Sequence, residues 1–210
     1  MKLYFSPGAC SLAPHIVLEE LGMSYQAESV DLASKKTSSG KDYNQINPKG
    51  SVPSLELNDG GLLTECAVLL QYLCDQHPEK ELLPKAGTEA HYRCLEWMNY
   101  IATEIHKGLG SLFAAERMFP QNAEMARDFK AATLKMMDQK LSFLNSHFKT
   151  SDYLMGSQYT AADAYLFVIL GWSKWLKVDM SKYPSLFAFM ERMMGRPAVQ
   201  KAMKKEGLLQ

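Results

Sequence analysis

Hydrophobic and polar positions predict alternating strands and helices in the first part of the chain. Lys2–Phe5 has the character of a short buried strand, and Ser11 begins a stretch with apolar residues at the helical i, i+3, i+4 and i+7 spacing. Residues 25–32 alternate between polar and apolar types, as a second strand does. A strand, a helix and a strand within about thirty residues predict a β-α-β unit with parallel strands.

The next stretch is rich in turn-forming residues. Residues 33–47 are polar and predict a loop with at most a short helix. The run Asn58-Asp59-Gly60-Gly61 is a strong hairpin signal between expected strands at 54–57 and 62–64. From Glu65 onward the apolar residues return to helical spacing. We therefore expect four strands with helices packed on them.

The pattern changes at His77-Pro78, and residues 79–87 are charged and contain a proline, which is typical of a linker. Beyond Thr88 the pattern is helical throughout, and Thr160-Ala161-Ala162-Asp163 resembles a capping box. Helices are expected near residues 89–112, 122–148, 160–176, 184–194 and 197–205. The predicted organisation is an α/β domain at 1–78, a linker at 79–87 and an all-helical domain at 88–210.

Composition narrows the class of protein. The chain has 210 residues, in which 23 Lys and Arg balance 23 Asp and Glu, so no basic surface argues for a nucleic-acid partner. The most apolar run, Tyr165 to Trp172, is too short to span a bilayer, and the N-terminus lacks the apolar core of a signal peptide. The four cysteines and five histidines show neither metal-ligand spacing nor a disulfide framework. We expect a cytoplasmic, globular protein without a metal, nucleic-acid or membrane partner.

Cys10 is the first candidate for chemistry. It lies between the first strand and the first helix, where free N–H groups and the helix dipole favour a negative charge. Such a position predicts a lowered thiol pKa and a larger thiolate fraction at neutral pH. The alternative is that Cys10 is a small buried hydrophobic residue, as most free cysteines are. The residues around it leave both interpretations open.

Four motifs together give the chain a family resemblance. They are Ser6-Pro7-Gly8-Ala9-Cys10-Ser11, Asn47-Pro48-Lys49-Gly50-Ser51-Val52-Pro53, Leu63-Thr64-Glu65-Cys66-Ala67, and Asn99 with His106-Lys107. The chain resembles the cytosolic glutathione transferases over its whole length, and most closely the bacterial beta class, whose members use a cysteine near the glutathione sulfur. The resemblance implies an α/β thioredoxin-like N-terminal domain followed by an all-α C-terminal domain.

The resemblance implies glutathione-binding roles in the first half. Val52, before a proline that is cis in the family, would pair its N–H and C=O with the cysteinyl backbone of glutathione. Cys66 would hold the γ-glutamyl carboxylate at a helix N-terminus, and Glu65 would meet the amino group unless it is an ordinary first-turn acid. Lys35 is the candidate for the glycyl carboxylate. The family usually has serine in place of Cys66, and since a thiol is the weaker donor we expect weaker carboxylate binding.

A second wall of the site is implied on the first helix of the second half. Helical spacing places four polar residues on one face, Asn99, Thr103, His106 and Lys107. That pattern alone is typical of a solvated face, but the resemblance implies that His106 hydrogen-bonds the cysteine or glutathione sulfur and stabilises the thiolate. Asn99, Thr103 and Glu104 would help to form the wall, and Lys107 would attract the carboxylates of a ligand. Some of these contacts would come from a second subunit.

The implied activity is conjugation of glutathione to small hydrophobic electrophiles by a homodimer. The electrophile would lie between the two halves, near Ala9 and Phe113. Cys10 would add thiol transfer or peroxide reduction through a mixed disulfide. A maleylacetoacetate isomerase-like enzyme is a rival, although its run of two serines before a cysteine is not present here. A non-enzymatic module of the same fold that binds a ligand or a partner is the other alternative.

Overall fold

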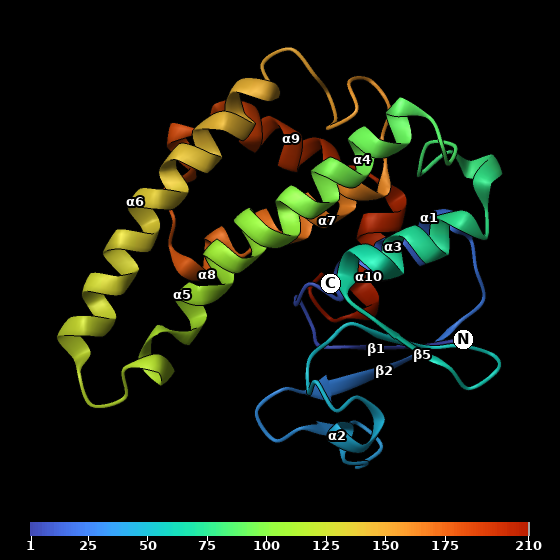
Figure 1. The fold of residues 1–210 in the computed structure, drawn as a ribbon, viewed down its shortest axis with the longest axis horizontal. Helices are drawn as coiled ribbons and strands as arrows, with labels where there is room; N and C mark the ends of the chain where they lie inside the picture. The colour runs from blue at the N-terminus through green and yellow to red at the C-terminus, as the bar shows by residue number, and fades with distance from the viewer. Residues whose placement is uncertain (210) are drawn as a thin grey trace.

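The computed structural model describes residues 1–209, and its first half is built around one mixed sheet (Figure 1). Its strands are β1 (Lys2–Phe5), β2 (Gln26–Asp31), β3 (Lys36–Thr37), β4 (Ser54–Glu56) and β5 (Leu62–Thr64), in the order β3-β2-β1-β4-β5. β1 and β2 are parallel, which confirms the predicted β-α-β unit, and the other three pairings are antiparallel. The strand that leads into Cys10, β1, therefore lies at the centre of the sheet.

The expected number of strands was wrong by one. β3 has only two residues, too few for an alternating pattern, and it pairs antiparallel with the end of β2. The chain reverses after it at Gly40, whose φ of 83° is in the left-handed region that glycine adopts without strain. The short helix α2 (Tyr43–Ile46) then follows, as the expected loop with at most a short helix allows.

Two helices of the first half lie between the sheet and the helical half (Figure 1). α1 (Leu12–Leu21) and α3 (Cys66–Asp75) pack against each other, and both pack against α7 (Ala161–Gly171) of the second half. α1 ends at Gly22, whose left-handed conformation caps the helix as its sequence predicts. The residues of α1 and α3 therefore reach both halves of the molecule.

The second half is helical, and its elements largely follow the predicted ranges. After the 3-10 turn η1 (Pro78–Lys80), they are α4 (Glu89–Tyr100), the π-helical segment η2 (Ile101–His106), α5 (Lys107–Met118), α6 (Ala123–His147), α7, α8 (Ser173–Leu176), the 3-10 turn η3 (Met180–Lys182), α9 (Pro184–Met194) and α10 (Pro197–Lys205). Two expectations were wrong: the helix expected to end at residue 112 continues to Met118, and the one expected at 160–176 is divided at Trp172. The division into two domains joined by a linker at 79–87 stays a prediction.

α7 is buried on all sides, which explains why its sequence lacks a polar face. All ten residues from Ala161 to Leu170 are buried. The predicted capping box is present at its start, where the Asp163 carboxylate accepts from the Thr160 N–H at 2.8 Å. The other carboxylate oxygen accepts from the Leu154 N–H at 2.7 Å, so Asp163 also holds the preceding loop.

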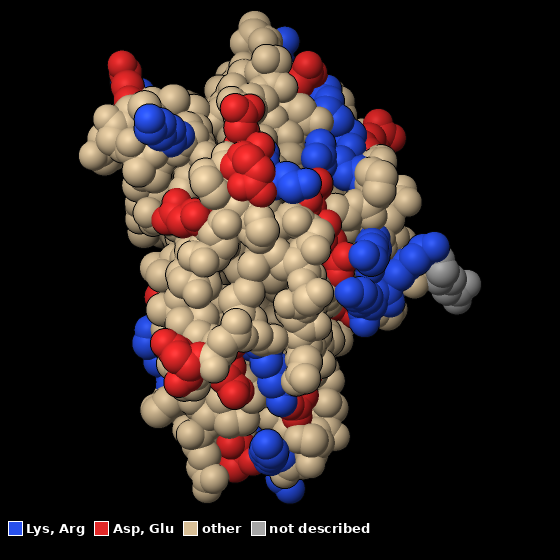
Figure 2. All heavy atoms as spheres, turned by 90° about the vertical axis from the view of Figure 1, so that its right-hand side faces the viewer, with Lys and Arg blue, Asp and Glu red and all other residues tan. Residues whose placement is uncertain are grey.

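The surface mixes charges of both signs. Figure 2 shows acidic and basic side chains interspersed on one face, without an extended area of a single sign. Within residues 1–209 no helix is both long and apolar enough to cross a membrane. The same residues contain no group of three or more His, Cys, Asp and Glu side chains arranged to hold a metal ion.

Candidate functional site

The loop after β1 carries Cys10 against the segment before β4. Cys10 is only 8% exposed, and its thiol donates to the Val52 carbonyl at 3.3 Å. The loop itself is fixed locally, because the Ser6 N–H donates to the Ser11 hydroxyl oxygen at 3.1 Å. The Val52–Pro53 bond is cis, as the family resemblance implied. The structure thus brings together Cys10 and Val52, two of the expected site residues.

The expectation of a lowered pKa at Cys10 was wrong. Burial raises the pKa of this thiol to about 12, and the backbone N–H groups of Cys10 and Ser11 lower it by less than burial raises it. Glu65 and Glu206 raise it further through their negative charge. Cys10 also precedes the first helical residue, Leu12, and faces a carbonyl acceptor that favours the protonated thiol.

The start of α3 offers backbone donors rather than side-chain ones. The Cys66 thiol is buried and turned toward the backbone of Cys10, whose carbonyl it reaches at 3.5 Å. Burial raises the pKa of this thiol well above its usual range. Glu65 is exposed, has a left-handed φ of 73°, and pairs with Lys49 at 2.7 Å. The first N–H groups of α3 have no acceptor within the helix, so this terminus is suited to an anion.

The Lys35 side chain contacts the chain segment before β4 that includes Val52. Its ammonium donates to the Gly50 carbonyl at 2.6 Å, and its backbone is left-handed with a φ of 57°. Gly50 is two residues before Val52, and the Val52 N–H makes no hydrogen bond among residues 1–209. Residues 50–52 therefore contact the Lys35 ammonium at one end and carry the free Val52 N–H at the other, next to the carbonyl that Cys10 contacts.

The helical wall differs from the expected one because of the π-helical segment η2. The wider i→i+5 spacing of a π-helix shifts the register, so His106 is half-buried while Asn99, Thr103 and Lys107 are exposed. The four residues therefore do not share one solvated face. The Glu104 carboxylate pairs with Lys140 of α6 at 2.5 Å, and its role in the wall stays a prediction.

Neither Asn99 nor Thr103 reaches beyond its own helix. The Asn99 amide donates to the Leu95 carbonyl at 2.9 Å, and the Thr103 hydroxyl donates to the Asn99 carbonyl at 3.0 Å. Both are the local i to i−4 bonds that side chains of this kind make on a helix. Their roles at a ligand, and that of Lys107, stay predictions.

His106 is held by aromatic residues of the second half. Its Nδ1 lies 2.7 Å from the Tyr165 hydroxyl, and its ring stands edge-on to Trp172 with centroids 5.0 Å apart. Burial, and to a lesser extent the positive charge of Lys107, lower the pKa of His106 to about 4, so the imidazole is neutral at pH 7. No hydrogen bond joins His106 to Cys10 among the described residues, so only the expected bond to a glutathione sulfur stays a prediction.

No local sequence pattern indicates which residues hold Gly8 in place. The Trp172 indole N–H donates to the Gly8 carbonyl at 2.9 Å, and a Glu206 oxygen accepts from the Gly8 N–H at 2.9 Å. The other Glu206 oxygen lies 2.8 Å from His15 Nδ1, in a fully buried pair. These partners are more than 160 residues from Gly8, and no local pattern relates such distant positions.

Gly8 must be glycine at this contact. A Cβ atom there would lie 2.2 Å from the indole ring of Trp175, and the residue has a φ of 72°. Because residue 8 has no side chain, Trp175 can approach the backbone beside Cys10 this closely.

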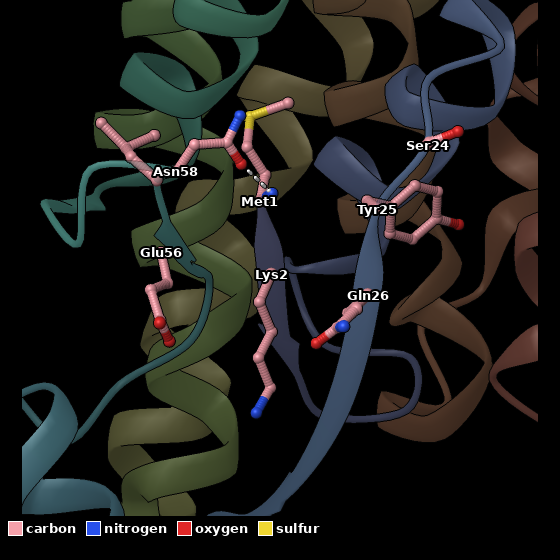
Figure 3. A pocket seen from close by; sticks show the side chains of 8 residues that line it. Met1, Lys2, Ser24, Tyr25, Gln26, Glu56 and Asn58 are labelled. Carbon is pink, nitrogen blue, oxygen red and sulfur yellow. Dashed lines mark hydrogen bonds between the residues drawn. The ribbon is translucent and has the colours of Figure 1, made fainter.

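An apolar cavity of 550 Å³ borders Gly8 on the side of the last helices. Its walls come from α1, α7, α8, α9, α10 and the chain that follows, and they include Leu12, Phe167, Trp172, Trp175, Met190, Met194, Met203 and Leu208. A second hollow, of 460 Å³, lies at the edge of the sheet (Figure 3). There the Met1 ammonium donates to the Asn58 amide oxygen at 2.6 Å, Lys2 pairs with Glu28, and the Glu56 carboxylate accepts from the Tyr4 hydroxyl at 2.9 Å, so each of these charged groups already has a polar partner.

Family models agree with the two halves of the chain. The glutathione S-transferase N-terminal domain matches residues 8–76, and the glutathione S-transferase C-terminal domain matches residues 100–197. Glutathione S-transferase GstA of Escherichia coli O157:H7 is 43% identical, over 99% of this chain and 100% of that protein. A probable maleylacetoacetate isomerase of Caenorhabditis elegans is 28% identical, over 90% of this chain and 86% of that protein, so the isomerase alternative is not favoured.

Three solved structures are similar throughout. A ternary complex of BphK, a bacterial GST, has a TM-score of 0.92 and 45% identity over 99% of this chain and 100% of that one. A sphingomonad glutathione S-transferase complexed with glutathione has a TM-score of 0.90 and 41% identity, with 99% and 100% covered. The bacterial beta class enzyme of Sphingomonas chungbukensis has a TM-score of 0.91 and 41% identity, with 100% of both chains covered. The chain belongs to the glutathione S-transferase family, and its similarity is to the bacterial beta class.

Proposed function

We propose that this glutathione transferase binds glutathione with its sulfur between Cys10 and His106. The enzyme activates that sulfur and conjugates glutathione to small apolar electrophiles. The observation that carries the proposal is the free Val52 N–H, which lies next to the Val52 carbonyl that the Cys10 thiol contacts. A backbone edge of this kind pairs with the backbone of an extended peptide. The similar sphingomonad structure is described as complexed with glutathione, which supports this tripeptide as the ligand.

Groups that can bind the two carboxylate ends of glutathione lie on either side of Val52. The γ-glutamyl carboxylate would bind the N–H groups at the start of α3, with the exposed Glu65 near its amino group. The glycyl carboxylate would bind Lys35, whose ammonium now donates only to the Gly50 carbonyl. Asn99, Thr103 and Lys107 would contact the ligand of their own or of a second subunit.

In this mechanism Cys10 is a protonated hydrogen-bond donor at neutral pH and not a thiolate nucleophile. Its raised pKa keeps the thiol protonated at pH 7, and a protonated thiol can donate to a thiolate beside it. Stabilising the glutathione thiolate in this way lowers the pKa of the bound sulfur, and each unit raises the thiolate fraction up to about tenfold. The sulfur then attacks the electrophilic carbon, and the electrophile's leaving group departs.

Disulfide exchange at Cys10 is the secondary activity. The Cys10 thiolate would attack a disulfide, release one thiol and form a mixed disulfide, which a glutathione thiolate then resolves. The burial that raises the Cys10 pKa makes the first step slow at neutral pH. Exchange should therefore accelerate with pH more steeply than conjugation does.

The apolar cavity beside Gly8 is the candidate site for the electrophile. It borders the loop that carries Cys10, and aromatic and methionine side chains make up much of its wall. The Ala9 and Phe113 positions expected for the electrophile are near it, since Phe113 stands edge-on to Trp172 with centroids 5.6 Å apart.

Met194→Trp, which fills the cavity, should raise the KM for 1-chloro-2,4-dinitrobenzene and leave the KM for glutathione unchanged. Equal effects on both would place the electrophile elsewhere.

Two assays and one binding experiment test the proposal together. The protein should be retained on immobilised glutathione, conjugate 1-chloro-2,4-dinitrobenzene and reduce hydroxyethyl disulfide. Cys10→Ala should abolish the reduction and keep part of the conjugation. Retention with both activities at background would favour a non-enzymatic module of this fold.

A homodimer in the cytoplasm is also part of the proposal. Val68 on α3 and Tyr92 on α4 are 47% and 62% exposed, and large apolar side chains of this kind are often covered by a partner. Sedimentation of the wild type as a dimer, and of Val68→Glu as a monomer, is the expected result.

The four cysteines are free, and reduced glutathione is the co-substrate, which together suit a reducing compartment.

A further inference from the structure

A buried tyrosine hydroxyl approaches the ring of His106 from the interior of the second half. Tyr165 is 2% exposed and lies on α7, among side chains that are otherwise almost all apolar. Its hydroxyl is 2.7 Å from His106 Nδ1, and the two rings stand edge-on at 88°. A buried tyrosine hydroxyl needs a hydrogen-bond partner, and His106 is that partner here.

The other nitrogen of His106 is free and accessible. Only two buried side-chain polar atoms within residues 1–209 lack a partner, His15 Nε2 and the Tyr159 hydroxyl. His106 Nε2 makes no hydrogen bond among these residues and is not one of the two, so part of its surface is open to a ligand. Trp172 packs against the ring from a second direction and, through its own N–H, holds Gly8.

The chemistry of the neighbours sets the direction of the bond between Tyr165 and His106. The Cys66 thiol also interacts with the Tyr165 hydroxyl, but sulfur is a weak acceptor. The Cys66 thiol already donates to the Cys10 carbonyl. The imidazole Nδ1 is the stronger acceptor, and a short O–H to nitrogen contact fits donation from tyrosine.

We propose that the Tyr165 hydroxyl donates to His106 Nδ1 and thereby places the ring proton on Nε2, so that Tyr165 is a positioning residue for the thiolate of bound glutathione. A neutral imidazole carries one N–H, and the hydrogen bond at one nitrogen decides which nitrogen has it. With the proton on Nε2, the accessible nitrogen is a donor and stabilises an anionic sulfur. With the proton on Nδ1, the accessible nitrogen would be an acceptor and would repel it. The inference rests on the proposed function, in which His106 faces the glutathione sulfur.

The tautomer can be measured directly on the wild-type protein. Long-range proton–nitrogen correlation spectra of protein with nitrogen-15-labelled histidine distinguish Nε2–H from Nδ1–H, and His106→Gln identifies the signals of His106 among the five histidines. We expect the Nε2–H tautomer at pH 7 in the free protein. An Nδ1–H tautomer of His106 in the wild-type protein would overturn the proposal.

Two tyrosine variants form a matched pair for the kinetic test. Tyr165→Phe and Tyr159→Phe each remove one buried hydroxyl, but only the Tyr165 hydroxyl has a partner. Tyr165→Phe should lose the pure Nε2–H signature and lower kcat for conjugation by roughly five- to tenfold, with little change in the KM for glutathione. Tyr159→Phe should match the wild type in both. Equal effects of the two substitutions, or an unchanged tautomer in Tyr165→Phe, would contradict the proposal.

Separate measurements distinguish a failure of the proposed function from a failure of the inference about Tyr165. Wild-type protein that fails to bind glutathione in a calorimeter, or His106→Gln that conjugates at the full wild-type rate, would defeat the proposed role of His106. The tautomer of the free protein does not depend on either result. An Nε2–H tautomer that disappears in Tyr165→Phe would therefore still support the hydrogen bond by which Tyr165 orients the ring.

Discussion

Cys10 lies next to the start of a helix, yet the backbone N–H groups near its sulfur do not offset the burial of a thiolate. Its thiol faces a carbonyl, and two carboxylates add negative charge around it. The sequence shows the strand, the loop and the helix, but it does not show how deeply the second half covers the loop. Sequence reasoning therefore identified the residue and predicted its pKa shift in the wrong direction.

Alkylation of Cys10 tests this reversal. Because the pKa is raised to about 12, the rate of carbamidomethylation by iodoacetamide should be very low at pH 7. The rate should then rise about tenfold with each unit up to pH 10, since only the thiolate reacts. The Cys10→Ala protein supplies the background from the other three cysteines. A rate that levels off near pH 8.5, where an ordinary cysteine titrates, would contradict the burial argument.

Cys66 offers a second test at the scale of one side chain. Its thiol is turned toward the Cys10 backbone, so only the N–H groups of α3 are available to a carboxylate. Cys66→Ser should tighten glutathione binding by roughly fivefold in calorimetry, because one hydroxyl hydrogen bond contributes about 1 kcal/mol. Cys66→Ala is the matched control and should bind as the wild type does. A large loss of affinity in Cys66→Ala would show that the thiol itself binds the ligand.

Among the secondary-structure elements, most were predictable from local pattern and the π-helical segment was not. The strands at 2–5 and 62–64, the Gly22 cap and the capping box at Thr160 all have signals within a few residues. The segment η2 contains ordinary helix-forming residues, and only packing against α6 and α7 distinguishes it from an α-helix. That register shift is what turns His106 toward Tyr165, so the site could not be placed correctly from helical spacing.

The cap of α7 gives a pH-dependent prediction. Burial raises the pKa of Asp163 to about 6, above the usual value of 3.8, despite hydrogen bonds from Leu154 and Thr160. The folded state thus binds this proton more tightly than the unfolded state does, so the contribution to stability is present below pH 4 and is lost as pH rises to 6. The loss amounts to about 3 kcal/mol.

Asp163→Asn isolates this effect, because an amide does not titrate. The free energy of unfolding, measured with urea, should fall relative to that of Asp163→Asn between pH 4 and pH 6 and stay parallel above that range. Acids with lowered pKa values, such as Glu19 and Glu28 at about 2, are present in both proteins and cancel in the comparison. A difference that is constant over the range, or that grows with pH, would rule out the raised pKa.

On the scale of the whole molecule, the end of the chain holds its beginning. Glu206, just beyond α10, accepts from the Gly8 N–H and contacts His15, while Trp172 donates to the Gly8 carbonyl. The loop that carries Cys10 is therefore positioned by residues of the helical half. The fold class was predictable from the sequence because each half has its own pattern. The contacts between the halves were not, since they join residues without any local relation.

Hydrogen exchange at the Gly8 amide measures this connection. Glu206→Gln keeps the size of the side chain but weakens the acceptor, because charged acceptors form stronger hydrogen bonds than neutral ones. The Gly8 amide should exchange roughly tenfold faster in this variant. Glu20→Gln, which removes an ion pair with Arg196 on the same side of the molecule, should leave that amide unchanged. Equal acceleration in both variants would indicate general loosening instead.

In the proposed mechanism the reactive sulfur belongs to glutathione, and the protein lowers the pKa of that sulfur. The most direct test is a pH titration of the ultraviolet absorbance of the thiolate in the glutathione complex. Cys10 does not interfere below pH 10, because its own pKa is about 12. We expect a bound thiol that titrates well below free glutathione in the wild type, and still below it in Cys10→Ala. A bound thiol that titrates at the pH of free glutathione in the wild type would contradict it.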